Sequence, residues 1–167
     1  MLRHLLSIAL LPFVVVVLIP RWLLGAWSTA DTRWIGGTIP SAAAHLAGIL
    51  IFLAGFAFFA WCVSLFARLG KGTLAPWDPT RRLVVAGPYT YIRNPMISGV
   101  LAMLVGETVF LGSQVLGIWT LAFFLINDIY FRLLEEPGLE RRFGASYLEY
   151  KTVVPRWIPA DKPWKNV

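Results

Sequence analysis

The stretch from residue 42 to residue 69 constrains this chain more than any other part of it. Its only polar side chains before Arg68 are His45 and Ser64. A hydrocarbon core of ~30 Å needs about 20 helical residues, so a run of this length can cross a bilayer as a tilted helix. Hydrophobic residues make up 57% of the chain, which is far above the share in an ordinary soluble domain. We therefore expect a membrane protein, and 167 residues allow one domain.

Three further apolar runs have the length and the flanking residues of membrane helices. The expected spans are residues 5–25, 42–69, 96–112 and 115–134. The expected fold is thus all-α and polytopic, with about four transmembrane helices, a folded connector at 70–95 and a polar C-terminal segment at 135–167. A secretory signal peptide is the alternative for the first run, but Arg21 and two tryptophans follow it, which favours a retained helix.

The distribution of arginine and lysine orients these spans. Basic side chains gather in the connector and the C-terminal segment, and only Arg21 and Arg33 fall on the other side. Because cytoplasmic loops carry the basic excess, both termini are predicted in the cytoplasm, and the cell (inner) membrane is the expected location. The chain has a net charge of +6, and we expect its basic side chains to face anionic lipid headgroups. No nucleic-acid partner is expected. Cys62 stands alone in an apolar run, so neither a disulfide nor a metal site is expected.

The sequence GPYTYIRNPMISG, residues 87–99, is the most unusual part of the connector. Pro88 and Pro95 each fix φ and remove a backbone donor, so this stretch is not a plain helix. Irregular backbone at the membrane edge is tolerated only where it is buried in protein or lines a wet cavity. The connector is therefore the first candidate for a functional site.

Folding of the connector against the end of the fourth span would bring Arg93 and Asn94 near Arg132, Glu135 and Glu136. Such a pocket has both signs of charge at the bilayer edge. It suits a zwitterionic or cationic polar cofactor together with a substrate from the lipid side. Salt bridges that only anchor helix ends are the alternative interpretation.

Other parts of the chain carry weaker signals. Gly99 and Gly106 lie on nearly one face of the third span, where they allow a neighbouring helix to approach closely. Glu107, in the same span, is either a functional carboxylate or a paired group with a packing role. In the C-terminal segment, apolar side chains at helical intervals predict an amphipathic helix on the membrane surface. These side chains are Leu139, Phe143, Tyr147 and Tyr150.

Two motif blocks occur in a fixed order. The first is GPY-x-Y-x-RNP, and the second, ~35 residues later, is EE-x(6)-FG-x2-Y-x2-Y followed by PR-x2-P. Over Gly72 to Pro159 they resemble the superfamily of isoprenylcysteine carboxyl methyltransferases and phospholipid methyltransferases. The resemblance implies a helical membrane enzyme that binds S-adenosyl-L-methionine from the cytoplasm and methylates a lipid-like acceptor. The chain has no GxGxxG motif, which excludes a soluble Rossmann methyltransferase.

The resemblance also implies site residues by position. Cofactor contacts are implied at Arg81, Arg82, Leu83, Val84, Tyr89, Asn94, Pro95, Met96, Ile97 and Glu136. Glu136 would hold the ammonium group of the cofactor, and Tyr89 and Asn94 its nucleoside or methionine part. Arg132 and Asn94 are the implied catalytic residues, with Arg132 toward the acceptor.

The chain departs from the family's usual motif at two positions. That motif is RHP followed one residue later by tyrosine, and here Asn94 and Ile97 take the places of the histidine and the tyrosine. Asparagine donates and accepts hydrogen bonds but cannot serve as a general base. The methyl acceptor of the family's carboxyl methyltransferases therefore cannot simply be assigned to this chain.

Two other functions remain open. One is a membrane reductase of the steroid-reductase type, which uses NAD(P)H, with Arg81 and Arg82 as partners for a 2′-phosphate. The other is a non-catalytic membrane protein that binds a lipid. The GPY and RNP blocks favour the methyltransferase.

Overall fold

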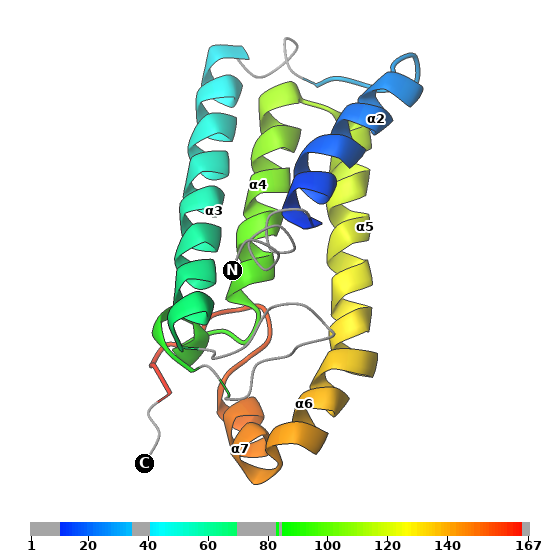
Figure 1. Ribbon diagram of the computed structural model, residues 1–167. Helices are drawn as coiled ribbons and strands as arrows, with labels where there is room; N and C mark the ends of the chain where they lie inside the picture. The colour runs from blue at the N-terminus through cyan, green and yellow to red at the C-terminus, as the bar shows by residue number, and fades with distance from the viewer. Residues whose placement is uncertain (1–10, 35–40, 70–82, 84, 165–167) are drawn as a thin grey trace.

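The computed structural model describes residues 11–34, 41–69, 83 and 85–164. Within these ranges the chain is helical, and the only β-type pairing is an isolated bridge between Arg33 and Ser113. The expectation of an all-α fold is confirmed for this part of the chain. Helices α3 (Ser41–Leu69), α4 (Pro95–Leu111) and α5 (Gln114–Tyr130) run along the long axis of the bundle, as Figure 1 shows.

The first described helical segment crosses α4 and α5 near one end of the bundle (Figure 1). It consists of a π-helical turn, η1 (Val14–Leu18), and α2 (Ile19–Ala26). A proline follows the π turn closely: Pro20 has no backbone N–H, and its ring clashes with the carbonyl four residues earlier in a regular α-helix. The wider turn before Pro20 relieves this clash.

Two helices are long and apolar enough to cross a membrane, namely Ser41–Leu69 and Gln114–Phe143. Leu11–Ala26 and Pro95–Leu111 are apolar but shorter. The predicted spans at 42–69 and 115–134 thus fall within the two long helices, and a total of four spans stays a prediction. On α3, the large side chains of Leu46, Leu50 and Leu53 are more than half exposed, which suits a face toward lipid.

Helices α3 and α4 touch along their backbones, because glycines face one another at two levels of the helix pair. A Cβ atom added to Gly48 would lie 2.7 Å from the carbonyl oxygen of Gly106, and one added to Gly55 would lie 2.8 Å from that of Gly99. Real Cβ atoms do not approach so closely, so glycine is required there. The predicted close approach at Gly99 and Gly106 is confirmed, with α3 as the neighbour.

The fourth apolar helix does not end at residue 134, where we expected the polar C-terminal segment to begin. It continues through a π-helical turn, η3 (Phe131–Glu135), into α6 (Glu136–Phe143). Pro137 explains this turn in the same way as Pro20 explains η1. The helix therefore carries Glu135 and Glu136 at a distortion of its backbone, and such π turns are frequent at functional sites.

The apolar side chains expected on one amphipathic helix lie on two short helices instead. Gly144, with φ of +55°, ends α6, and α7 (Ala145–Val153) begins immediately after it. Tyr147 and Tyr150 of α7 are buried together with Val154. The side chains that pack around them are Leu83, Val85, Leu139, Phe143 and Trp164. These apolar groups thus pack within the protein, and a membrane-surface position of this region stays a prediction.

Candidate active site

The described part of the connector, residues 83 and 85–94, has the irregular backbone that Pro88 and Pro95 predict. It contains a 3-10 turn, η2 (Gly87–Thr90), which places Tyr89 in the interior with 5% of its surface exposed. Asn94 occupies the position before α4 with φ of −119° and ψ of 52°, and its side chain does not cap the helix. Pro95 is the first residue of α4, a position where a backbone N–H would have no acceptor within the helix, so its absence costs nothing. The amide of Asn94 is thereby left available to other groups.

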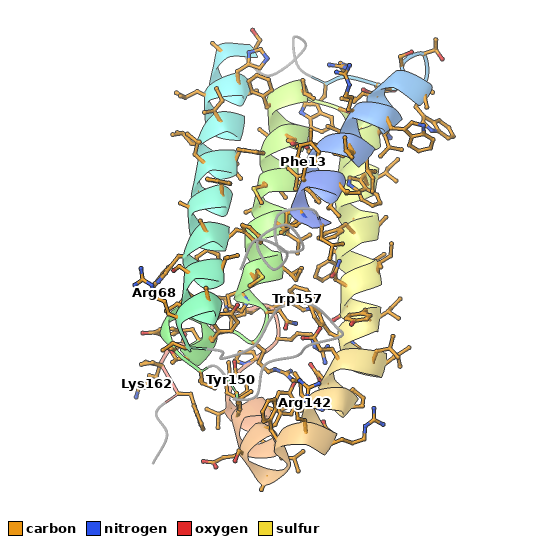
Figure 2. The ribbon with its side chains drawn as sticks, viewed as in Figure 1. Phe13, Arg68, Arg142, Tyr150, Trp157 and Lys162 are labelled. Atoms are coloured by element: carbon orange, nitrogen blue, oxygen red, sulfur yellow. The ribbon has the colours of Figure 1, made fainter. Side chains whose placement is uncertain are left out.

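The C-terminal tail, residues 154–164, is hydrogen-bonded to the connector. Its backbone bonds, each 2.9 Å long, join Arg93 N–H to Pro155 O, Ala160 N–H to Tyr91 O and Trp164 N–H to Thr90 O. From α7, the buried hydroxyl of Tyr150 donates to the carbonyl oxygen of Tyr89 at 2.7 Å. Figure 2 labels Tyr150 and Trp157 in this region, at the end of the bundle where the connector, the tail and α7 meet.

A buried carboxylate, that of Glu136, joins these segments. Arg93 of the connector contacts Glu136 Oε1 at 2.8 Å and Arg156 of the tail contacts the same oxygen at 2.7 Å. Lys151 of α7 lies 3.3 Å from Oε2. Because buried charges are stable only when paired and hydrogen-bonded, this carboxylate fixes the positions of all three cations. The expected meeting of the connector with the helix end is therefore present.

Asp128 extends this charged cluster along α5. Its Oδ1 accepts from Trp157 Nε1 at 2.8 Å and from Arg156 at 3.1 Å, and its Oδ2 pairs with Arg132 at 2.8 Å. Arg156 thus bridges Asp128 and Glu136. The side chain of Arg132 is 60% exposed, so it lies at the edge of the cluster and faces outward.

The protonation states of the surrounding groups follow from their neighbours. Hydrogen bonding to Glu136 raises the pKa of Arg156, and hydrogen bonding to Glu140 raises the pKa of Lys151, so both stay cationic. Burial raises the pKa of Tyr150. Burial also raises the pKa of Tyr89, and electrostatic interactions with Cys62, Tyr150 and Glu135 raise it further. Both tyrosines are therefore neutral at physiological pH.

Three polar groups of the connector and of η3, the segments that meet at Glu136, have no such pairing. Arg93 Nε and Asn94 Nδ2 are buried donors without a hydrogen bond to any residue that the structure describes. Glu135 is half-buried and forms no ion pair within the same ranges. Buried donors without acceptors are rare in proteins, so these groups make this end of the bundle the candidate site for a ligand with acceptor atoms.

The other residues implied by the resemblance differ in where they lie. Arg81, Arg82 and Val84 lie outside the described residues, so the structure says nothing of them. Leu83 packs against the buried tyrosines of α7. Pro95 and Met96 belong to the first turn of α4, and Ile97 packs against the core of the bundle.

Several members of the cluster were not predicted from the sequence. They are Asp128, Lys151, Arg156 and Trp157. Asp128 is an acid inside the fourth apolar run, and such an acid is a functional candidate by the same argument that applies to Glu107. Arg156 and Trp157 belong to the PR-x2-P motif, whose position against the connector depends on a contact between distant parts of the chain.

Together, these observations define a helical bundle with two helices long and apolar enough to cross a membrane and a charged candidate site at one end. Residues 43–146 match the sequence model of the family described as phospholipid methyltransferase, and the chain belongs to this family. The family is part of the superfamily that includes the isoprenylcysteine carboxyl methyltransferases, so the resemblance carried by the two motif blocks is confirmed. No curated protein and no solved structure matches the chain.

Proposed function

We propose that this protein is an S-adenosyl-L-methionine-dependent methyltransferase that acts on a lipid-like acceptor at the boundary between membrane and cytoplasm. The family is one of methyltransferases, and a phospholipid methyltransferase domain implies a lipid substrate in a membrane. The observation that carries the proposal is the set of unpaired polar groups on the segments that Glu136 joins. It lies where the connector, α6 and the tail meet, at the end of an apolar bundle.

The residues present fit this cofactor. Its ammonium group would be held by the Glu135–Glu136 pair. The resemblance implies Glu136 for this role, and Glu135 forms no salt bridge among the described residues. Arg93 Nε and Asn94 Nδ2 are donors for its carboxylate or ribose oxygens. When bound, the cofactor supplies a methyl group activated by its sulfonium. Among the described residues, no group of three or more acidic, histidine or cysteine side chains is arranged to hold a metal.

The contribution of the protein is then mainly to position the reactants and exclude water. Alignment of two bound reactants supplies ~7–11 kcal/mol of a reaction barrier. The tail covers the connector through its backbone hydrogen bonds, which limits access of water to that side. Asn94 cannot take a proton, so the acceptor must already present a lone pair. Arg132, exposed at the edge of the cluster, is placed to contact the acceptor's headgroup.

The proposed arrangement in the membrane has four spans, with the connector and both termini on the cytoplasmic side of the cell (inner) membrane. The two long apolar helices and the two shorter ones support this arrangement. The Glu136 cluster then faces the cytoplasm, where the cofactor is found. Arg132 lies next to it, where a lipid headgroup enters from the bilayer.

The test is ligand binding by the purified protein in detergent. We expect S-adenosylhomocysteine to raise the melting temperature and NADPH to leave it unchanged. Methyl transfer from labelled cofactor to a membrane lipid extract, with mass identification of the product, then identifies the acceptor. Stabilisation by NADPH alone would establish the reductase alternative, and binding of lipid with no response to either nucleotide would establish the non-catalytic one.

A further inference from the structure

A cavity of about 690 Å³ lies between the first helical segment, α3 and α4. Its volume falls in the range of about 300–1,000 Å³ that is usual for small-molecule sites. Most of its walls are apolar, including Val17, Leu24, Phe52 and Phe110. Glu107 lines the cavity and lies ~20 Å along α4 from Asn94, at 1.5 Å rise per residue. The cavity is thus distant from the Glu136 cluster.

Two charged side chains, Glu107 and Arg21, line this apolar cavity. Glu107 Oε2 is buried and accepts no hydrogen bond from any described residue. Arg21 is exposed and forms no ion pair within the described ranges, although Glu107 lines the same space. A charged group in an apolar span is costly and typically marks a ligand or transport path. Glu107 and Arg21 line one cavity without forming an ion pair with each other, so they suit a ligand that carries both a positive and a negative charge.

The surroundings of the cavity indicate that such a ligand enters from the bilayer. Ile49, Leu53 and Phe110 line the cavity and are also 45%, 56% and 36% exposed, respectively. On a helical bundle in a membrane, exposed side chains of this kind face lipid chains. The cavity therefore opens sideways to lipid, and its apolar walls suit hydrocarbon.

We propose that this cavity binds a zwitterionic membrane lipid whose headgroup carries a primary ammonium and a phosphate. The ammonium donates to Glu107, which is an acceptor without a donor, and the phosphate contacts Arg21. A quaternary ammonium has no N–H to donate, and an anionic headgroup without an amine leaves Glu107 unpaired. The lipid held here is not the methyl acceptor, because its headgroup lies too far from the Glu136 cluster. It is a second lipid site.

The experiment is native mass spectrometry of the full chain in detergent, titrated separately with dioleoyl phosphatidylethanolamine, phosphatidylcholine and phosphatidylglycerol. We expect the phosphatidylethanolamine adduct to form at the lowest lipid concentration. E107Q should weaken it about tenfold, since a hydrogen bond to a charged group is lost. R21Q should weaken it as well. Equal binding of all three lipids, or a preference for phosphatidylglycerol, would overturn the proposal.

A second pair of variants tests the site without a change of charge. Gly25 lines the cavity, and a Cβ added there meets no atom within 4 Å, so G25L fills the space without a backbone clash. Gly138 in α6 is equally open and lies outside the cavity, so G138L is the matched control. We expect G25L to lose the adduct and G138L to keep it. An adduct that survives in both G25L and E107Q contradicts the proposal, whatever the methyltransferase assay shows.

Discussion

Glu135 and Glu136 are neighbours in the sequence but have different surroundings. Glu136 is buried against three cations from three segments, whereas Glu135 has no ion-pair partner within the described part of the chain. A buried carboxylate with several partners holds the structure together, and an unpaired one beside it is available to a cationic ligand. The two residues should therefore respond differently to the same substitution.

For the pair of variants E135Q and E136Q we expect a clear separation. E136Q leaves three cations without their shared carboxylate, so it should lower the free energy of unfolding by about 3 kcal/mol and also abolish binding of S-adenosylhomocysteine. E135Q should keep the melting temperature and weaken that binding about tenfold. Thermal unfolding and calorimetry measure both effects. Unchanged affinity in E135Q would remove Glu135 from the cofactor site.

Tyr150 connects α7 to the connector through its buried hydroxyl. Y150F leaves the carbonyl oxygen of Tyr89 without this donor, and we expect a loss of about 1–2 kcal/mol in stability. Because burial raises the pKa of Tyr150, the folded protein keeps this proton above about pH 10, where the unfolded chain loses it. Stability should thus fall as the pH rises through that range.

The pH effect is measured by melting temperatures in detergent at about pH 8 and pH 10.5, values chosen on either side of the ordinary tyrosine pKa. The decrease should be smaller in Y150F than in the wild type. Y91F is the control, since Tyr91 is 38% exposed. The same decrease in Y150F as in the wild type would show that another group titrates.

At the scale of the helices, the glycine contacts between α3 and α4 leave no space for a methyl group. In G106A the new Cβ would lie 2.6 Å from the backbone nitrogen of Phe52, so the helices must separate. We expect a loss of about 2 kcal/mol in stability. In α5, a Cβ at Gly117 meets Thr108 at an ordinary 3.6 Å. The control G117A should therefore be neutral or more stable by up to about 1 kcal/mol.

Thermal unfolding of G106A and G117A in one detergent makes this comparison. Similar melting temperatures for the two variants would mean that α3 and α4 can separate without loss of stability. That result would contradict the role of the glycines in holding these helices together.

The sequence predicted the helices better than it predicted where the last of them ends. The apolar runs at 42–69, 96–112 and 115–134 fall within one residue of the helix starts at Ser41, Pro95 and Gln114. The change from polar to apolar residues marks each of these helix starts directly in the sequence. The continuation past residue 134 was not foreseen, because Pro137 and the charged residues after it are typical of a helix end. A π turn before the proline instead lets the helix continue.

The site was predictable where its residues belong to motifs and not where the chain folds back on itself. The meeting of Arg93 with Glu136 was predicted from folding of the connector against the end of the fourth span. Lys151 and Arg156 lie in a basic segment, and basic residues there are usually solvated, so no local signal assigned them to Glu136. Trp157 donates to Asp128 only because the tail folds back against α5. Such long-range contacts are not encoded in periodicity or composition.

At the scale of the whole molecule, the tail completes the candidate site. A chain truncated after Val153 loses the three backbone bonds to the connector and the contacts of Arg156 and Trp157. We expect it to keep the helix content of α3, α4 and α5 by circular dichroism but to lose binding of S-adenosylhomocysteine. A chain ending at Trp164 keeps these contacts and is the control. Full binding by the shorter chain would show that the site does not need the tail.

Because the tail hydrogen-bonds to the connector, the proposed site is completed by residues that are synthesised after the helices. A ribosome adds residues from the N-terminus at about 5–20 per second, and early parts of a chain fold first. The connector and α3, α4 and α5 are therefore synthesised before Pro155 and Trp164, which hydrogen-bond to the connector. On the proposed function, we therefore expect a nascent chain that lacks Pro155 and Trp164 to be inactive, so that methyl transfer begins only once the tail is in place.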